Sequence, residues 1–141
     1  MSGPHALLTP ILALVTWSLV MWVWMYATRI PAIGKAGLEP ANAKEPASLN
    51  VLPLAVRQVA YNYNHLMEQP TIFYALVVYT YLVGQQDTVS VALAWFYVTS
   101  RVVHSLIQAT VNAILLRFGV HVLGSLALFA LAARDILALF G

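Results

Sequence analysis

Two groups of polar residues lie inside segments that are otherwise apolar enough to cross a lipid bilayer. Each group contains one charged residue, Glu68 or Arg101, and such charges are costly in a membrane unless they have partners and a function. The polar residues recur at three- and four-residue spacing, which places them on one face of a helix. The first group is Arg57, Tyr61, Asn64, His65 and Glu68, and the second is Arg101, His104, Ser105, Gln108 and Asn112. If the two faces meet, Glu68 and Arg101 can form an ion pair within one shared polar site.

The last apolar segment adds Arg117 and His121. With about 1.5 Å of rise per residue, both fall at a depth similar to that of His65, His104 and Gln108. Three helices therefore contribute polar groups to one layer, where each group would be costly if it stayed unpaired. Arg117 can either extend to lipid headgroups or hold an anion at the mouth of the site.

Metal binding and hydrolysis fit these residues poorly. His65, His104 and His121 form no His-x-x-x-His pair on one helix, and Glu68 is the only carboxylate nearby, so no metal site is predicted. Ser105 lacks a Ser-His-acid arrangement if that carboxylate is already paired. The chain has no cysteine, so any thiol chemistry has to come from a ligand. A purely structural function, in which the polar groups only fasten the helices together, stays open.

The composition is that of an integral membrane protein. Of the 141 residues, 61% are hydrophobic and only 9% are charged, which is too few for the surface of a soluble domain. The net charge is +2 and the basic residues are scattered, so nucleic acid is not expected as a partner. No Lys or Arg precedes the first apolar segment and no small-residue cleavage site follows it, so it is predicted to be a retained span rather than a signal peptide.

Four spans are predicted, because roughly 20 apolar residues cross the hydrocarbon core. Arg29, Ile30 and Pro31 are expected to end the first span. The second is longer than the bilayer needs and contains Pro70, which predicts a local kink. Short links favour antiparallel neighbours, so the expected fold is an all-α, four-helix membrane bundle forming one domain, 1–141. The spans are about 6–28, 54–84, 89–112 and 114–138, with a loop outside the bilayer at about 29–53 and a turn at 84–87.

The distribution of Lys and Arg near the span ends predicts the orientation. Only Arg134 lies on the side opposite the long loop. By the positive-inside rule, the loop is expected in the cytoplasm and both termini outside. The basic residues on the loop side are Arg29, Lys35, Lys44, Arg57 and Arg117.

The order of these motifs resembles the bacterial branch of the MAPEG family, the membrane-associated proteins of eicosanoid and glutathione metabolism. The resemblance covers all four predicted spans in order and spacing. It is carried by Asn62-Tyr63-Asn64-His65-Leu66-Met67-Glu68-Gln69-Pro70, by Phe73-Tyr74-Ala75, by Arg101-Val102-Val103-His104-Ser105, and by Asn112 and Arg117.

The resemblance implies a trimer of four-helix protomers in a bacterial inner membrane, with glutathione as cosubstrate between adjacent protomers near the cytoplasmic side. Arg117 matches the arginine that stabilises the glutathione thiolate and is the implied catalytic residue. A positive charge beside a thiol favours its ionised form. A lipophilic electrophile would arrive through the membrane, so lipids and lipophilic small molecules are expected partners. The implied glutathione-binding residues are Asn64, His65, Glu68, Arg101, His104, Gln108 and His121.

Two positions depart from the family pattern. His65 stands where an asparagine is usual, and Gln108 stands where several of the family's enzymes have a tyrosine that touches the sulfur. Some members bind lipid without catalysis. Two functions therefore stay open: a glutathione transferase or peroxidase acting on lipophilic electrophiles, or a non-catalytic lipid-binding or scaffolding protein. A transporter or channel is disfavoured because the sequence shows no paired broken helices or internal repeat.

Overall fold

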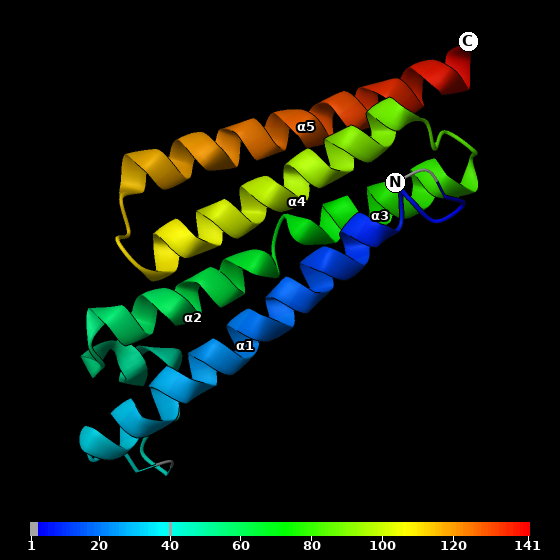
Figure 1. Ribbon diagram of the computed structural model, residues 1–141. Coiled ribbons are helices and arrows are strands. Elements are labelled where there is room, and N and C mark those ends of the chain that lie inside the picture. Colours follow the sequence, from blue (N-terminus) through cyan, green and yellow to red (C-terminus); the bar gives the residue numbers. More distant parts are fainter. Residues whose placement is uncertain (1–2, 40) are drawn as a thin grey trace.

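The computed structural model describes residues 3–39 and 41–141. All of its regular structure is helical. The elements are α1 (Thr9–Lys35), the 3-10 helix η1 (Pro46–Val51), α2 (Leu54–Leu66), α3 (Pro70–Leu82), α4 (Thr88–Ala109) and α5 (Ile114–Phe140). Both termini and the link between α3 and α4 lie at one end of the molecule, and the α1–α2 loop and the link between α4 and α5 lie at the other (Figure 1).

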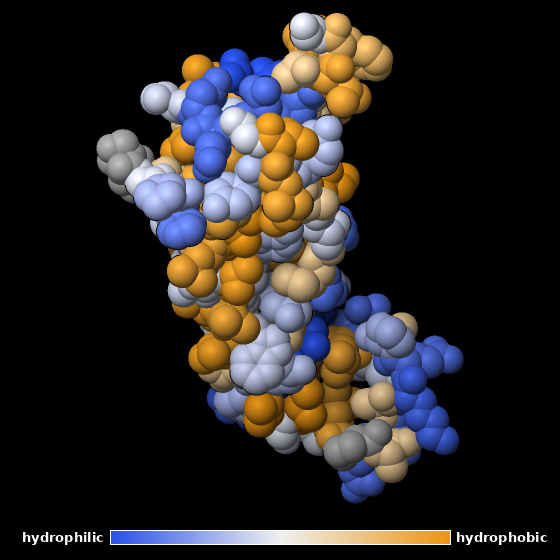
Figure 2. Space-filling model, turned by 90° about the vertical axis from the view of Figure 1, so that its right-hand side faces the viewer, coloured by the Kyte–Doolittle hydropathy of each residue, from blue (hydrophilic) through white to orange (hydrophobic). Residues whose placement is uncertain are grey.

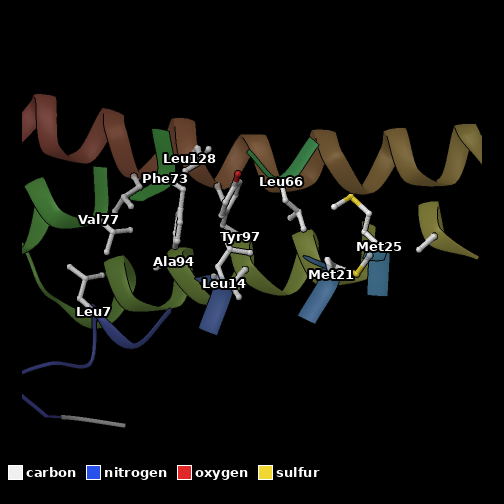
Figure 3. Close-up of a cluster of buried hydrophobic side chains, with 14 of the residues drawn as sticks. Leu7, Leu14, Met21, Met25, Leu66, Phe73, Val77, Ala94, Tyr97 and Leu128 are labelled. Carbon is white, nitrogen blue, oxygen red and sulfur yellow. The ribbon is translucent and has the colours of Figure 1, made fainter. Parts of the chain in front are cut away.

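An apolar core runs along the length of the molecule. In α1, Leu14, Met21 and Met25 are seven and four residues apart and are buried, as expected for one face of a helix (Figure 3). The ring of Phe73 stacks on that of Tyr97, with centroids 4.6 Å apart, so α3 packs against α4 in the middle of this core.

The outer surface is also apolar. Leu115 of α5 keeps 86% of its surface exposed and Leu12 of α1 keeps 66%. On the face shown in Figure 2, hydrophilic residues gather towards the two ends of the molecule. The helices α1, α4 and α5 are each long and apolar enough to cross a membrane. These apolar outer faces suit contact with lipid chains.

The predicted second span is divided into two helices, which is more than the expected kink. Pro70 has no N–H to donate, and its ring clashes with the carbonyl four residues before it, which belongs to Leu66, the last residue of α2. In the break, the N–H groups of Met67 and Glu68 bond three residues back, to Asn64 and His65, at 3.0 and 3.3 Å. Glu68 therefore lies in a short non-helical segment in the middle of the molecule.

The first helix does not end at Arg29 to Pro31, where the first span was expected to end. It continues to Lys35, because a proline removes only one hydrogen bond from the helix and the turns after it re-form. Gly37, with φ +65, ends it, and the N–H of Leu38 bonds the carbonyl of Ile33 at 3.3 Å. This is the usual glycine-dependent termination of a helix.

The turn predicted at 84–87 is present. Gly84 has φ +77 and ends α3, and the Asp87 carboxylate caps α4 by accepting a hydrogen bond from the Ser90 N–H at 2.8 Å. At the opposite end, α4 stops at Ala109, and Asn112 lies outside the helix with φ +51.

Candidate functional site

A pocket of about 480 Å³ opens between α2, α4 and α5, in the half of the molecule near the α4–α5 link. It contains both polar and apolar side chains, as small-molecule sites usually do. Its lining residues are Tyr61, Asn64, His65, Glu68, His104, Gln108, Ile114, Arg117, Phe118 and His121. Every residue predicted to bind glutathione lines this pocket except Arg101, which lies behind it.

Arg101 is the best-buried charged residue described, with 1% of its surface exposed. Its Nη1 lies 2.9 Å from Nδ1 of His121 and 3.4 Å from Nε2 of His65. Arginine can only donate hydrogen bonds, so both of these nitrogens act as acceptors and carry no proton. The proton of His65 is therefore on Nδ1, which donates to the Glu68 carboxylate at 3.1 Å. The contacts assign the tautomer of each ring.

The expected ion pair between Glu68 and Arg101 is not formed. His65 lies between them, bonding Glu68 with one ring nitrogen and Arg101 with the other. The Glu68 side chain is 68% exposed at the pocket, whereas Arg101 is in the interior. The Glu68 carboxylate is consequently available to a ligand. Arg101 does not line the pocket and instead contacts two histidines that do.

The rotation of α2 explains this difference. Its inner face is formed by Gln58, Asn62 and Leu66, which are buried. The predicted face turns outward instead, with Tyr61 and Asn64 exposed. Two kinds of contact hold this rotation: Leu66 packs in the apolar core, and Gln58 forms hydrogen bonds with the end of α4.

The predicted face of α4 is, in contrast, on the inside. His104, Ser105 and Gln108 are all buried, together with Arg101. Gln58 of α2 caps this helix by donating from Nε2 to the carbonyls of Ala109 and Thr110, at 3.1 and 2.9 Å. These carbonyls lack helical partners at a C-terminus, so the contact fixes the end of α4 next to the pocket.

Arg117 is positioned by Asn112, whose Oδ1 accepts a hydrogen bond from Nη1 at 2.9 Å. Asn112 has a left-handed backbone, which asparagine adopts more readily than most residues. Arg117 lies one helical turn before His121, so the two side chains share a face of α5 that lines the pocket.

Gln69 is a structural residue whose role sequence reasoning did not predict. Its Nε2 donates to Ser125 Oγ at 2.9 Å, and its Oε1 accepts from the Tyr97 hydroxyl at 3.2 Å. The break between α2 and α3 is therefore braced against both α5 and α4. A polar residue directly before a proline within an apolar segment was the only available signal.

The three histidines converge although each lies on a different helix. One ring nitrogen from each of His65, His104 and His121 lies within 4.8 Å of the others. A metal ion there would compete with the Arg101 guanidinium for two of these lone pairs and would be repelled by its permanent charge. The geometry therefore favours an anionic ligand over a divalent cation, and the prediction that the site holds no metal stays a prediction.

A second hollow, of about 310 Å³, adjoins the pocket and shares Tyr61 and Asn64 with it. Arg29 and Arg57 line this hollow. Arg57 is held in place by the carbonyl of Leu52, which accepts from Nε at 2.9 Å. Together the two hollows offer a row of basic groups to an elongated ligand.

Comparison with curated proteins and with solved structures gives no significant match. A family model, in contrast, matches residues 7–137, nearly the whole chain. That match and the three apolar helices identify the chain as an integral membrane protein that belongs to the MAPEG family.

Proposed function

We propose that this protein binds glutathione in the pocket and uses its thiolate on lipophilic electrophiles, as a transferase or a peroxidase. The family includes both kinds of enzyme as well as non-catalytic members. The observation that carries the proposal is the charge around the pocket. Arg117 lines the wall and Arg101 lies behind the histidines, whereas the only acid on the lining is Glu68.

The ends of glutathione find complementary groups in this arrangement. Its amino group suits the exposed Glu68 carboxylate, because charge-assisted hydrogen bonds are the strong ones. Its glycine carboxylate, at the opposite end of the tripeptide, suits Arg29 and Arg57 in the adjoining hollow, since the planar guanidinium pairs well with a carboxylate. The thiol then falls near Arg117, and Asn64, His65, His104, Gln108 and His121 contact the peptide between the two ends.

Arg117 would do the chemistry by stabilising the thiolate. A nearby positive charge lowers the pKa of a thiol, so more of the nucleophile is present at neutral pH. In the transferase reaction, the sulfur forms a bond to the electrophilic carbon as the leaving group departs with its electron pair. In the peroxidase reaction, two glutathione molecules are oxidised to the disulfide as a hydroperoxide is reduced to an alcohol and water.

The lipophilic substrate would enter from the membrane. Ile114 and Phe118 supply apolar wall to the same pocket. The exposed apolar surface of α5 around the pocket is available to lipid or to a second protomer. We place the pocket at a protomer boundary in a homotrimer, with the 29–53 loop in the cytoplasm and both termini outside, in a bacterial inner membrane.

Titration of the purified protein with glutathione tests the proposal, with the ultraviolet absorbance of the thiolate as the readout. We expect a saturable signal that is lost in Arg117→Ala and largely kept in Arg117→Lys. Arg134→Ala is the matched control, because Arg134 is also on α5 but pairs with Asp87, away from the pocket. The absence of a saturable signal in the unmodified protein would remove glutathione from the proposal.

The alternative is a non-catalytic lipid-binding or scaffolding protein. Gln108 favours it, because this amide stands where several of the family's enzymes have a tyrosine that touches the sulfur. If glutathione gives no thiolate signal while a phospholipid still binds saturably at the pocket, this alternative replaces the enzyme.

A further inference from the structure

We propose that His121 donates a hydrogen bond from Nε2 to the sulfur of glutathione, and that Arg101 is a positioning residue that holds His121 in the tautomer able to do so. This inference rests on the proposed function, because it assigns a second donor to the same thiolate. Its basis is the contact between Arg101 and His121 and the position of His121 on the pocket wall.

The first step is the tautomer. Nη1 of Arg101 lies 2.9 Å from Nδ1 of His121, and a guanidinium can only donate. Nδ1 must therefore accept, which leaves the proton of the neutral ring on Nε2. The contact is buried on the Arg101 side, where only 1% of the residue is exposed, so water does not compete for it.

The second step is the direction of the remaining N–H. Nε2 is on the edge of the ring away from Arg101, and His121 lines the pocket. Within the described part of the chain, Nε2 has no hydrogen-bond partner, yet it is not among the buried atoms that lack one. It is therefore an accessible donor at the pocket.

Neither of the other two histidines has a free ring N–H at the pocket that a contact with Arg101 fixes on one nitrogen. His65 uses both ring nitrogens, one towards Glu68 and the other towards Arg101. His104 also lines the pocket, but neither of its ring nitrogens has a hydrogen-bond partner among the described residues, so no contact fixes which of them carries the proton. The charged and titratable groups around His121 are Arg101 and His104 on α4, His65 on α2, Glu68 in the break, and Arg117 on α5 itself.

The third step is the pairing with Arg117. The two residues are four apart on α5 and both line the pocket, so their side chains lie side by side on one helix face. A single anionic atom between them can accept from both. Such preorganised donors stabilise developing charge without having to reorganise. Arg117 supplies the charge and His121 supplies a directional neutral donor.

The pH dependence of thiolate absorbance in the glutathione complex tests this assignment. The amide of His121→Gln reaches the region of Nε2 and keeps a donor, whereas that of His121→Asn is shorter and reaches only the region of Nδ1. We expect the glutamine variant to titrate like the unmodified protein. Loss of one charge-assisted hydrogen bond in the asparagine variant should cut the thiolate fraction roughly tenfold on the low-pH side. An unchanged profile in His121→Asn would overturn the assignment.

A second measurement reads the tautomer directly and needs no variant. In protein with ¹⁵N-labelled histidine, the His121 resonances should show a protonated Nε2 and an unprotonated Nδ1 before glutathione is added. The opposite tautomer would overturn the role of Arg101. If the unmodified protein gives no glutathione signal, the proposed function fails. If it gives that signal and His121→Asn is unaffected, only this inference fails.

Discussion

Gly124 of α5 and Ser100 of α4 lie in direct contact. A Cβ added to Gly124 would overlap Oγ of Ser100 and lie 3.2 Å from its Cβ. The Ser100 hydroxyl is itself held by the carbonyl of Tyr97 at 2.7 Å. The two helices therefore approach each other at a pair of small residues, as helices in membranes commonly do. This contact sets the distance between the helices that carry Arg101 and His121.

Gly124→Ala should destabilise the protein by about 1–3 kcal/mol, because overpacking forces the helices apart or shifts side chains. Ser100→Gly in the same chain should recover most of the loss, since it removes the atoms that the new methyl group meets. The free energy of unfolding in detergent is the measurement. Equal stability of the Gly124→Ala variant and the unmodified protein would show that the contact is loose.

Gln69→Leu should lower stability by about 1–3 kcal/mol, because it leaves the buried Tyr97 hydroxyl without its acceptor. Tyr97→Phe alone removes the same hydrogen bond from the other side. If the hydrogen bond between Tyr97 and Gln69 stabilises the fold, the stability lost in the double variant should be less than the sum of the losses in the two single variants. Thermal unfolding of the four proteins gives the coupling, and strict additivity would argue against the brace.

Two variants of Asn112 distinguish the effect of backbone strain on stability from the effect of this side chain on thiolate formation. Its φ of +51 suits glycine and is costly for alanine, by about 1–2 kcal/mol. Asn112→Gly should therefore remain nearly as stable as the unmodified protein, and Asn112→Ala should be less stable. Both lose the acceptor that holds Arg117, so both should weaken thiolate formation to a similar extent. Equal stability of the two variants would contradict the backbone argument.

Asp87 should make stability depend on pH at the acidic end. The Ser90 backbone N–H and, to a lesser extent, the Arg134 guanidinium hold the pKa of the Asp87 carboxyl below its ordinary value of 3.8. Its contribution is thus fully present above pH 3.8 and is lost as the pH falls through the lower, folded-state pKa. Asp87→Ala should cost about 1 kcal/mol at neutral pH and flatten this dependence, and Asp87→Asn, which still caps the helix, should cost less.

Thr80 and Asp135 form a buried polar contact between α3 and α5, 2.6 Å long. Thr80→Val should cost about 1–3 kcal/mol, because it leaves a buried carboxyl oxygen without a partner. Thr80→Ser keeps the hydroxyl and serves as the control. Adding Asp135→Leu to Thr80→Val should restore much of the stability, since replacing both partners with apolar groups can be nearly neutral. Unfolding in detergent compares the four proteins.

Some of the site followed from residue types and spacing alone. The apolar segments predicted that Glu68, Arg101, Arg117 and three of the histidines lie in the same half of the bilayer, and the structure brings them to one pocket or directly behind it. Pro70 marked the interruption of the second segment, although the interruption is a break between two helices rather than the predicted kink. Helix interruptions and apolar spans can be predicted in this way, because each depends only on the residues of one continuous segment.

The tertiary structure decided which of these residues meet. Spacing predicts that Tyr61 and Asn64 share a face of α2, but only the contacts of Leu66 and Gln58 with the rest of the molecule determine where that face points. As a result, His65 rather than Glu68 reaches Arg101, over 36 positions of sequence, and His121 reaches it over 20. Such contacts depend on the rotation and separation of whole helices, and these follow from the sum of many apolar contacts rather than from any local pattern.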